Sequence, residues 1–222
     1  MRHLTRHFPL DGTVIPLGTP DSLDAGIVGD GAALLSRALS LGLPVANGFV
    51  VTVGFEGTGT LRAVRQAWTH ARGPVRMALS VNSASGHGFG AGPHFHNGST
   101  WSGLLDGLCD LLAHDQLENP HTHWRPWSIV IQRVPAVHRS VLVMGGDPFG
   151  SGRGISIWTR AAEGDDLGER LTWRRRRRLR ALAREAAGLL GHPVDLEVVY
   201  DRQGIARIVD CRPYGTAPWN QR

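Results

Sequence analysis

One segment of the chain, residues 28–52, combines two glycines, an amphipathic helix pattern, a Gly-Leu-Pro stop and an apolar run. The spacing of its leucines and alanines predicts a helix over residues 31–41, followed by a strand over residues 48–53. Gly29 and Gly31 precede the helix, where backbone N–H groups can hold a phosphate. A tight structural turn is the other interpretation of the same two glycines.

Composition limits the class of protein. The 222 residues, 41% of them hydrophobic, are enough for one large domain or two lobes with a real core. No apolar run approaches the length of a membrane span, and the N-terminal residues lack an apolar signal core. Cys109 and Cys211 cannot form a disulfide framework, so we expect a cytoplasmic protein. The formal net charge of +5 is compatible with nucleotides, nucleic acid or acidic surfaces as partners.

The order of the predicted elements indicates an α+β fold with mostly antiparallel sheets. We expect further helices over residues 61–71, 101–114 and 172–190, and a long Gly- and His-rich loop over residues 83–100. Strands are expected at 75–81, 128–134, 139–145 and 154–158, with a hairpin at 195–200 and 206–211. A connection over residues 118–126 divides the chain into an N-terminal lobe, 1–125, and a C-terminal lobe, 126–222.

The opening segment resembles the ATP-binding domain of the pyruvate phosphate dikinase and phosphoenolpyruvate synthase family. That family reads G-G-K-G-A-x-L and then G-L-P-V-P-x-G-F-V-V-T, which Gly29, Gly31 and residues 42–52 largely match. The resemblance implies an ATP-grasp-like fold, in which two lobes hold ATP between them, and it assigns Gly29 and Gly31 to the nucleotide site. The family lysine is replaced by Asp30. We interpret Asp30 as a helix cap or structural residue, with Mg²⁺ binding as the alternative.

Two further segments carry the resemblance. Residues 78–84, ALSVNSA, are similar to the family's A-V-R-S-S-A, and Asn82 stands where the family has a phosphate-binding arginine. Residues 128–152 are similar to a family segment in which Gln132 and Val134 would line the adenine pocket. A hairpin of core strands would explain the second pattern without any ligand.

The closing hairpin, residues 192–213, offers the clearest chemistry. With a turn at 201–204, strand parity places Glu197, Asp210 and Arg212 on one face of the hairpin. The opposite face would then carry four apolar side chains, those of Leu196, Val198, Val209 and Cys211. Such an acidic and basic face suits a Mg²⁺ site beside a phosphate-binding guanidinium, although a solvent-exposed charged face has the same spacing.

The resemblance adds roles to this face and covers residues from about 11 to 214. It makes Glu197 a Mg²⁺ ligand and Arg212 the catalytic, phosphate-facing residue. Asp210 stands where the family has a Gln, and we expect it to be the second Mg²⁺ ligand because the change keeps an oxygen ligand and adds charge. The family's phosphohistidine and substrate domains have no counterpart in the sequence. The chain would therefore be a stand-alone ATP-dependent phosphotransferase domain that acts with a separate partner protein or acceptor. The alternative is a catalytically degenerate relative, a pseudoenzyme that binds another ligand or a protein, since both phosphate-facing cations are replaced.

The arginine run at residues 174–178 is the other conspicuous feature. Five consecutive residues surround a helix, so these arginines cannot form one face, and we expect them to be the exposed first turns of a helix. Without aromatic residues interleaved among them, they do not favour nucleic acid as a partner.

Overall fold

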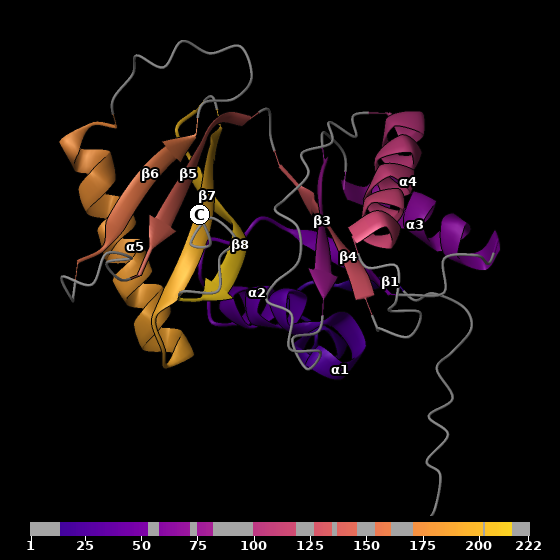
Figure 1. The fold of residues 1–222 in the computed structure, drawn as a ribbon, viewed down its shortest axis with the longest axis horizontal. Helices are drawn as coiled ribbons and strands as arrows, with labels where there is room; N and C mark the ends of the chain where they lie inside the picture. Colours follow the sequence, from indigo (N-terminus) through magenta and orange to yellow (C-terminus); the bar gives the residue numbers. More distant parts are fainter. Residues whose placement is uncertain are drawn as a thin grey trace, which may run out of the picture.

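The computed structural model describes residues 14–52, 58–71, 75–81, 100–118, 127–134, 137–145, 154–160, 171–201 and 203–214. Its strands form two antiparallel four-stranded sheets, the first in the order β1-β2-β4-β3 and the second in the order β6-β5-β7-β8 (Figure 1). The strands are β1 (Val14–Pro16), β2 (Gly48–Thr52), β3 (Val75–Val81), β4 (Trp127–Arg133), β5 (Val137–Met144), β6 (Ser156–Arg160), β7 (Val194–Asp201) and β8 (Ala206–Pro213). The helices are η1 (Pro20–Leu23), α1 (Ala25–Val28), α2 (Asp30–Ser40), α3 (Thr58–Ala71), α4 (Trp101–Glu118) and α5 (Trp173–Leu190).

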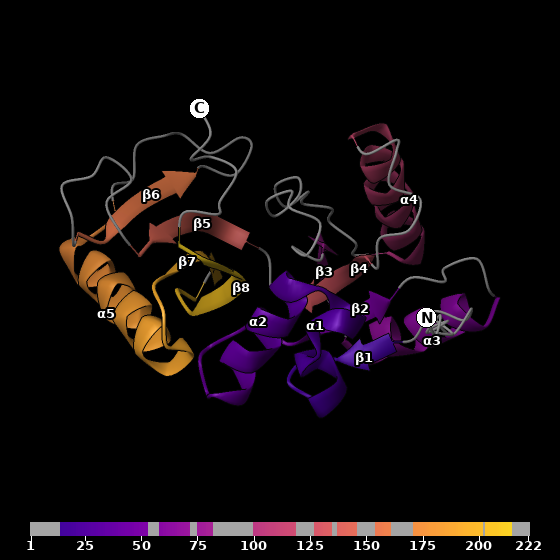
Figure 2. The ribbon, with the colours of Figure 1, turned by 60° about the horizontal axis from the view of Figure 1, so that its bottom comes forward.

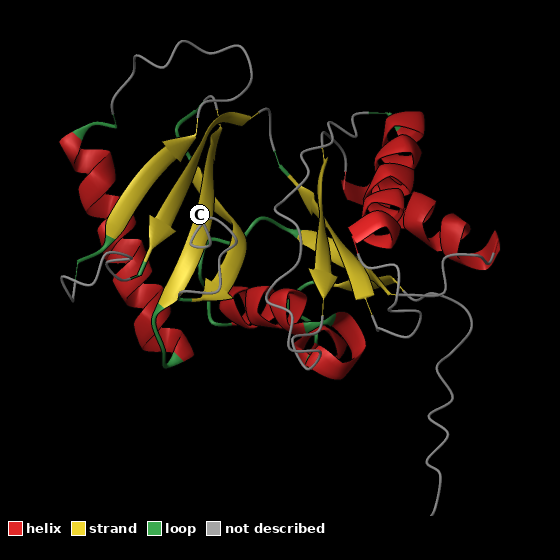
Figure 3. Ribbon diagram, in the orientation of Figure 1, coloured by secondary structure: helices red, strands yellow, loops and turns green. Residues whose placement is uncertain are grey.

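The first sheet has helices on both faces (Figure 3). Successive side chains of a strand point to opposite faces, and β2 uses both of its faces for packing. Phe49 and Val51 pack with Val64 of α3 and Leu104 of α4. Val50, which lies between them in sequence, belongs instead to the larger cluster that includes α2. This double burial explains why β2 is apolar throughout rather than alternating.

The second sheet is covered on one face by α5 (Figure 2). Leu179 and Ala183 of this helix are buried in one cluster with Val141 of β5 and with Leu196 and Val198 of β7. These positions recur at helical spacing in α5 and at alternate positions in β7, as the amphipathic patterns require. The face of the sheet that points away from α5 carries the polar residues described below.

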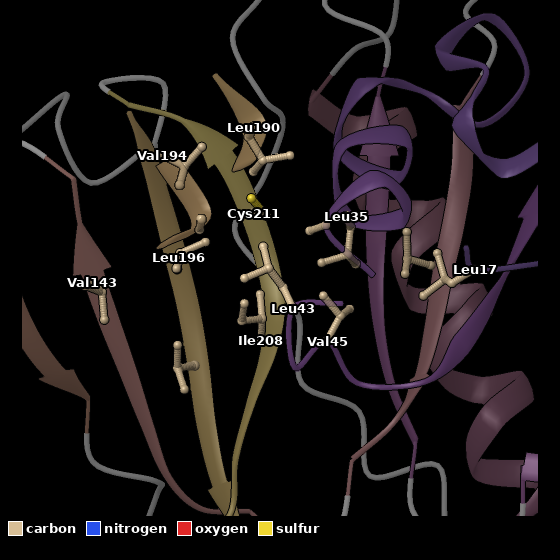
Figure 4. Close-up of a cluster of buried hydrophobic side chains, with 14 of the residues drawn as sticks. Leu17, Leu35, Leu43, Val45, Val143, Leu190, Val194, Leu196, Ile208 and Cys211 are labelled. Atoms are coloured by element: carbon tan, nitrogen blue, oxygen red, sulfur yellow. The ribbon is translucent and has the colours of Figure 1, made fainter. Parts of the chain in front are cut away.

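Helix α2 joins the two sheets, because Leu35 shares one buried cluster with Val50 of the first sheet and Ile208 of the second (Figure 4). The segment after α2 also pairs with β8. The amide of Ala46 donates to the Ile208 carbonyl over 2.9 Å, and the amide of Ile208 donates to the Pro44 carbonyl over 2.8 Å. Residues 44–46 therefore connect the first sheet to the edge of the second.

The predicted α+β class is confirmed, and the predicted helices and strands occur within a few residues of their expected ends. The predicted lobes, 1–125 and 126–222, do not coincide with the two sheets. Strand β4 follows residue 126 but lies between β2 and β3 in the first sheet, because it pairs with both of them along its length. Apart from residue 100, the predicted loop 83–100 lies outside the described residues. No helix in the described ranges is long and apolar enough to cross a bilayer.

Candidate functional site

Four charged side chains lie on the face of the β7–β8 hairpin that points away from α5. In the register of the hairpin, Glu197 is opposite Asp210 and Asp195 is opposite Arg212. Their neighbours in sequence, such as Leu196, face the core with α5. The structure thus brings together the three residues that strand parity predicted, Glu197, Asp210 and Arg212, and adds Asp195 to them.

Three of these four side chains are buried, and the fourth, that of Asp210, is partly buried. Asp195, Glu197 and Arg212 are 2%, 7% and 6% exposed. The Nε atom of Arg212 donates to Oδ2 of Asp210 over 2.6 Å. Buried charges are tolerated in proteins when they are paired and hydrogen-bonded. A solvent-exposed charged face, the alternative left open by the sequence, does not describe these side chains.

Asp195 is a site residue that sequence reasoning missed. Its Oδ1 accepts a hydrogen bond from the Gly145 amide at the end of β5, over 3.2 Å. A Cβ atom at Gly145 would lie 2.5 Å from the Val194 carbonyl oxygen, so only glycine allows this close approach. The signal was available, because Asp195 precedes Glu197 by two residues and must share its face.

One predicted orientation in the hairpin is wrong. Val209 was expected on the core face, but Val198 pairs with Ile208, and the register shifts between Glu197 and Val198. Val209 is the extra residue of this β-bulge and packs with Val134 and Val199 instead. A bulge inserts one residue into one strand, and counting alternate positions cannot reveal it.

Gln132 and Val134 lie where the chain passes from the first sheet toward the second. Gln132 is 1% exposed, and its Nε2 atom donates to the Ala46 carbonyl over 3.2 Å. Val134 is buried in a small apolar cluster with Ala46, Val199 and Val209. The cluster therefore contains residues from the connection after α2, the end of β4, and both strands of the hairpin.

Gly29 and Gly31 occupy the start of α2. Gly29 has φ of +79°, ends α1 and is the N-cap residue of α2. Asp30 is the first helical residue, not the cap that the sequence suggested, and its charge suits the positive end of the helix dipole. Gly31 lies in the first turn of the helix. The hydroxyl of Ser128 in β4 donates to the Val28 carbonyl, which holds this turn against the first sheet.

Two predictions remain, the phosphate-facing position of Asn82 and the Mg²⁺ site. Asn82 lies outside the described residues. Among the residues that the structure describes, no group of three or more His, Cys, Asp or Glu side chains could hold a metal ion. The two predicted Mg²⁺ ligands, Glu197 and Asp210, would by themselves supply two carboxylates to the ion.

Comparisons with known proteins show the fold. No protein-family model and no curated protein sequence matches the chain. In three dimensions, the two antiparallel sheets and their helices are those of the ATP-grasp fold, which confirms the predicted architecture. The specific kinship to the dikinase and synthase family stays a prediction.

Three solved structures illustrate the likeness. D-alanyl-alanine synthetase A from Vibrio cholerae matches with a TM-score of 0.54 and 11% identity, over 92% of this chain and 60% of that chain. The N5-carboxyaminoimidazole ribonucleotide synthetase PurK matches with a TM-score of 0.51 and 15% identity, over 88% of this chain and 48% of that chain. Biotin carboxylase from Campylobacter jejuni matches with a TM-score of 0.50 and 13% identity, over 83% and 41%. The chain therefore spans about half the length of these proteins, and the likeness concerns the fold alone.

Proposed function

We propose that this chain binds ATP between its two sheets and uses it for phosphoryl transfer. In this proposal it is a relative of the ATP-binding domain of the pyruvate phosphate dikinase and phosphoenolpyruvate synthase family. It would act on a separate phosphohistidine or substrate-domain protein, or on another acceptor. The observation that carries the proposal is the buried face with Glu197, Asp210 and Arg212 in an ATP-grasp fold. Two structures of this fold are nucleotide complexes: that of PurK with ADP, and that of the biotin carboxylase with β-γ-ATP.

The cluster around Val134 supports the position of the base. Val134, Val199 and Val209 form a buried apolar cluster with Ala46, and the Gln132 amide donates to the Ala46 carbonyl. Ligand sites in proteins combine such apolar walls with a few fixed polar groups. In our proposal the adenine ring contacts this cluster, and the phosphates extend toward the acidic residues of the hairpin and the glycines that begin α2.

Glu197 and Asp210 fit Mg²⁺ by their chemistry. Both offer carboxylate oxygens from directly opposite positions of adjacent strands. Mg²⁺ usually takes one or two carboxylates, completed by water and substrate phosphates, so a pair is sufficient. Asp210 uses one oxygen for Arg212. When bound, the ion would neutralise phosphate charge that the two carboxylates would otherwise repel.

Arg212 supplies the cation on the same face. Its guanidinium is held by Asp210 through Nε, so its orientation is set before a ligand arrives. A pre-oriented arginine contributes to phosphoryl transfer by stabilising charge on the phosphoryl oxygens. Asp195, opposite Arg212 and tied to the Gly145 amide, would keep that strand end in place. We assign Asp195 a positioning role.

The test is calorimetric titration of the whole chain with ATP, with and without Mg²⁺. We expect Mg²⁺-dependent binding that Glu197→Ala abolishes. Glu185→Ala is the matched control. Glu185 is exposed on α5, so this substitution removes the same charge at a position away from the site. Circular dichroism verifies that each variant is folded. No binding at millimolar ATP would contradict the proposal, and unchanged binding by Glu197→Ala would place the nucleotide elsewhere.

A second function is favoured by one observation: Asp30, an acid, is the first residue of α2 where the family pattern has a lysine. Together with Asn82, this replacement removes two phosphate-facing cations. The chain would then be a degenerate relative that binds another ligand or a protein. The double variant Asp30→Lys, Asn82→Arg separates the two functions. A large gain in ATP affinity would show an intact nucleotide site, and no gain would show that the site has been remodelled.

A further inference from the structure

The outer face of α5 concentrates positive charge at one end of the molecule. This helix covers the face of the second sheet opposite Glu197, and both views place it at the far side of that sheet from the first sheet (Figure 1; Figure 2). All basic residues of the helix are arginines. Those that are exposed define the arginine surface: Arg174, Arg176, Arg177, Arg178, Arg180 and Arg184.

The arginine surface is not explained by the stability of the helix. Its members crowd the N-terminal half of α5, where the helix dipole is positive and cations are unfavourable. The first turn contains no acidic residue, and Glu185 is the one acid in the sequence of the helix. Like charges three or four residues apart on a helix also repel one another, and Arg174 has Arg177 and Arg178 at these spacings. Packing is supplied by other residues, such as Leu179 and Ala183 on the buried face.

Two aromatic rings contact arginines of α5, one next to them in the sequence and one from β7. Trp173 begins the helix and is 68% exposed. The guanidinium carbon of Arg177 lies 5.5 Å from the centroid of the Trp173 ring, and that of Arg175 lies 5.5 Å from the centroid of Tyr200. The indole of Trp173 is therefore accessible to a planar ligand group, while Arg177 contacts its ring. Tyr200 is itself buried in the core, so the surface offers one exposed ring, that of Trp173, beside its exposed arginines.

We propose that the outer face of α5 binds single-stranded nucleic acid. Arginine forks match the two oxygens of a phosphate, and unpaired bases stack on tryptophan and on guanidinium planes. Charge complementarity alone would also suit an acidic protein, but the exposed Trp173 with its stacked Arg177 favours bases. This site is separate from the proposed ATP site, which lies on the opposite face of the sheet. It also revises the expectation from sequence, because Trp173 supplies the aromatic contact that the arginine run seemed to lack.

The experiment uses the whole chain and fluorescein-labelled dT20 and U20, with binding followed by anisotropy. We expect binding at about 50 mM salt that weakens steeply by about 200 mM, because each phosphate contact releases counterions. Arg174→Glu with Arg177→Glu should weaken binding at least about tenfold, since it removes two phosphate contacts and adds repulsion. The matched control is Arg37→Glu with Arg62→Glu, which reverses two arginines exposed on α2 and α3.

Trp173→Ala tests the role of stacking. We expect it to weaken binding to dT20 about tenfold while the dependence of affinity on salt stays unchanged, because it removes a stacked base and no phosphate contact. Trp158→Ala is its control, since Trp158 is also exposed, at 52%, but lies on β6. Poly-L-glutamate of similar charge is the competitor that represents an acidic protein.

Several outcomes would overturn the proposal. Equal losses in the two double variants would show that binding reflects overall charge rather than α5. Absence of binding at low salt would remove the site altogether. Full competition by poly-L-glutamate, together with normal binding by Trp173→Ala, would assign the surface to an acidic protein. Circular dichroism and ATP titration of the Arg174→Glu, Arg177→Glu variant verify that its fold and nucleotide site are unaffected.

Discussion

Arg212 and Asp210, which are two residues apart on β8, form an ion pair with Nε and Oδ2 separated by 2.6 Å. Their side chains are 7% and 16% exposed, so water screens the pair only partly. Across the hairpin, Asp195 and Glu197 face the same two positions. The guanidinium of Arg212 therefore shares one face of the hairpin with three carboxylates, and it forms an ion pair with that of Asp210.

We predict that Arg212→Ala is more destabilising than Asp210→Ala. The first variant leaves Asp210 without the guanidinium that it pairs with, on a face that also carries Asp195 and Glu197, whereas the second removes one of these three carboxylates and leaves Arg212 opposite Asp195. Losing a partner from a buried pair costs roughly 3 kcal/mol, and a better compensated charge costs about half of that. Urea unfolding measures both free energies, and the double variant gives the coupling between the residues. A larger loss for Asp210→Ala would contradict this account of the site's electrostatics.

Gly48 in β2 is expected to tolerate no side chain. A Cβ atom there would lie 2.2 Å from the Ile131 carbonyl oxygen and 2.8 Å from the Cα atom of Gln132. Both neighbours are backbone of β4 and cannot move aside without disturbing the sheet. Gly48→Ala should lower the free energy of unfolding by about 3 kcal/mol, as measured by chemical denaturation.

Gly188 in α5 is the matched control for Gly48. Apart from its chain neighbours and the nearby backbone of its own helix, no atom lies within 4 Å of the Cβ position, and the residue is exposed. Gly188→Ala should raise the free energy of unfolding by about 0.5–1 kcal/mol, because alanine loses less backbone entropy in a helix. Equal effects of the two alanines would show that the close approach at Gly48 does not exist.

Leu196 marks the contact between the hairpin and α5. It is fully buried in the cluster shown in Figure 4, and a cavity would remain if it were shortened. Leu196→Ala should cost about 2–5 kcal/mol in thermal or urea unfolding. Leu189→Ala, at a site 41% exposed on α5, should change stability by well under about 1 kcal/mol. If the two variants were equally mild, the proposed packing of α5 on this sheet would be wrong.

The two cysteines should differ in reactivity and in their effect on stability. Cys109 is exposed and Cys211 is fully buried. Burial, and after it the charges of Asp210 and Asp195, raise the pKa of the Cys211 thiol above its ordinary value of 9.0. At pH 8 we expect a disulfide reagent to modify one thiol in the native protein and two after denaturation. Fast modification of the Cys109→Ser variant would contradict the burial of Cys211.

The same pKa shift has a consequence for stability. Because the folded protein holds the Cys211 proton more tightly than the unfolded chain, this contribution to stability is complete below pH 9.0 and is lost as pH rises above it. The slope is at most about 1.4 kcal/mol per pH unit for one proton. Cys211→Ala should remove that slope, which urea unfolding at several pH values would measure. A slope that persists in the variant would have to arise from other groups.

Sequence reasoning recovers most elements because their periodicity is local. The alternation in residues 75–81 and the amphipathic pattern of α5 each depend on neighbours along the chain, and each element is found where it was predicted. Strand parity likewise predicts that Glu197 and Arg212 share a face, since successive side chains of a strand must alternate. The ATP-grasp fold was accessible by resemblance, although no family model matches the chain.

Tertiary structure decides what depends on partners distant in sequence. The insertion of β4 between β2 and β3, the pairing of Ala46 with Ile208 and the bulge at Val209 each follow from packing and hydrogen bonds between distant segments. Burial is decided in the same way: the sequence shows charges on a hairpin, but only the assembled sheets remove them from water. Local pattern therefore determines which residues can act together, and the packing of the two sheets determines the environment in which they do so.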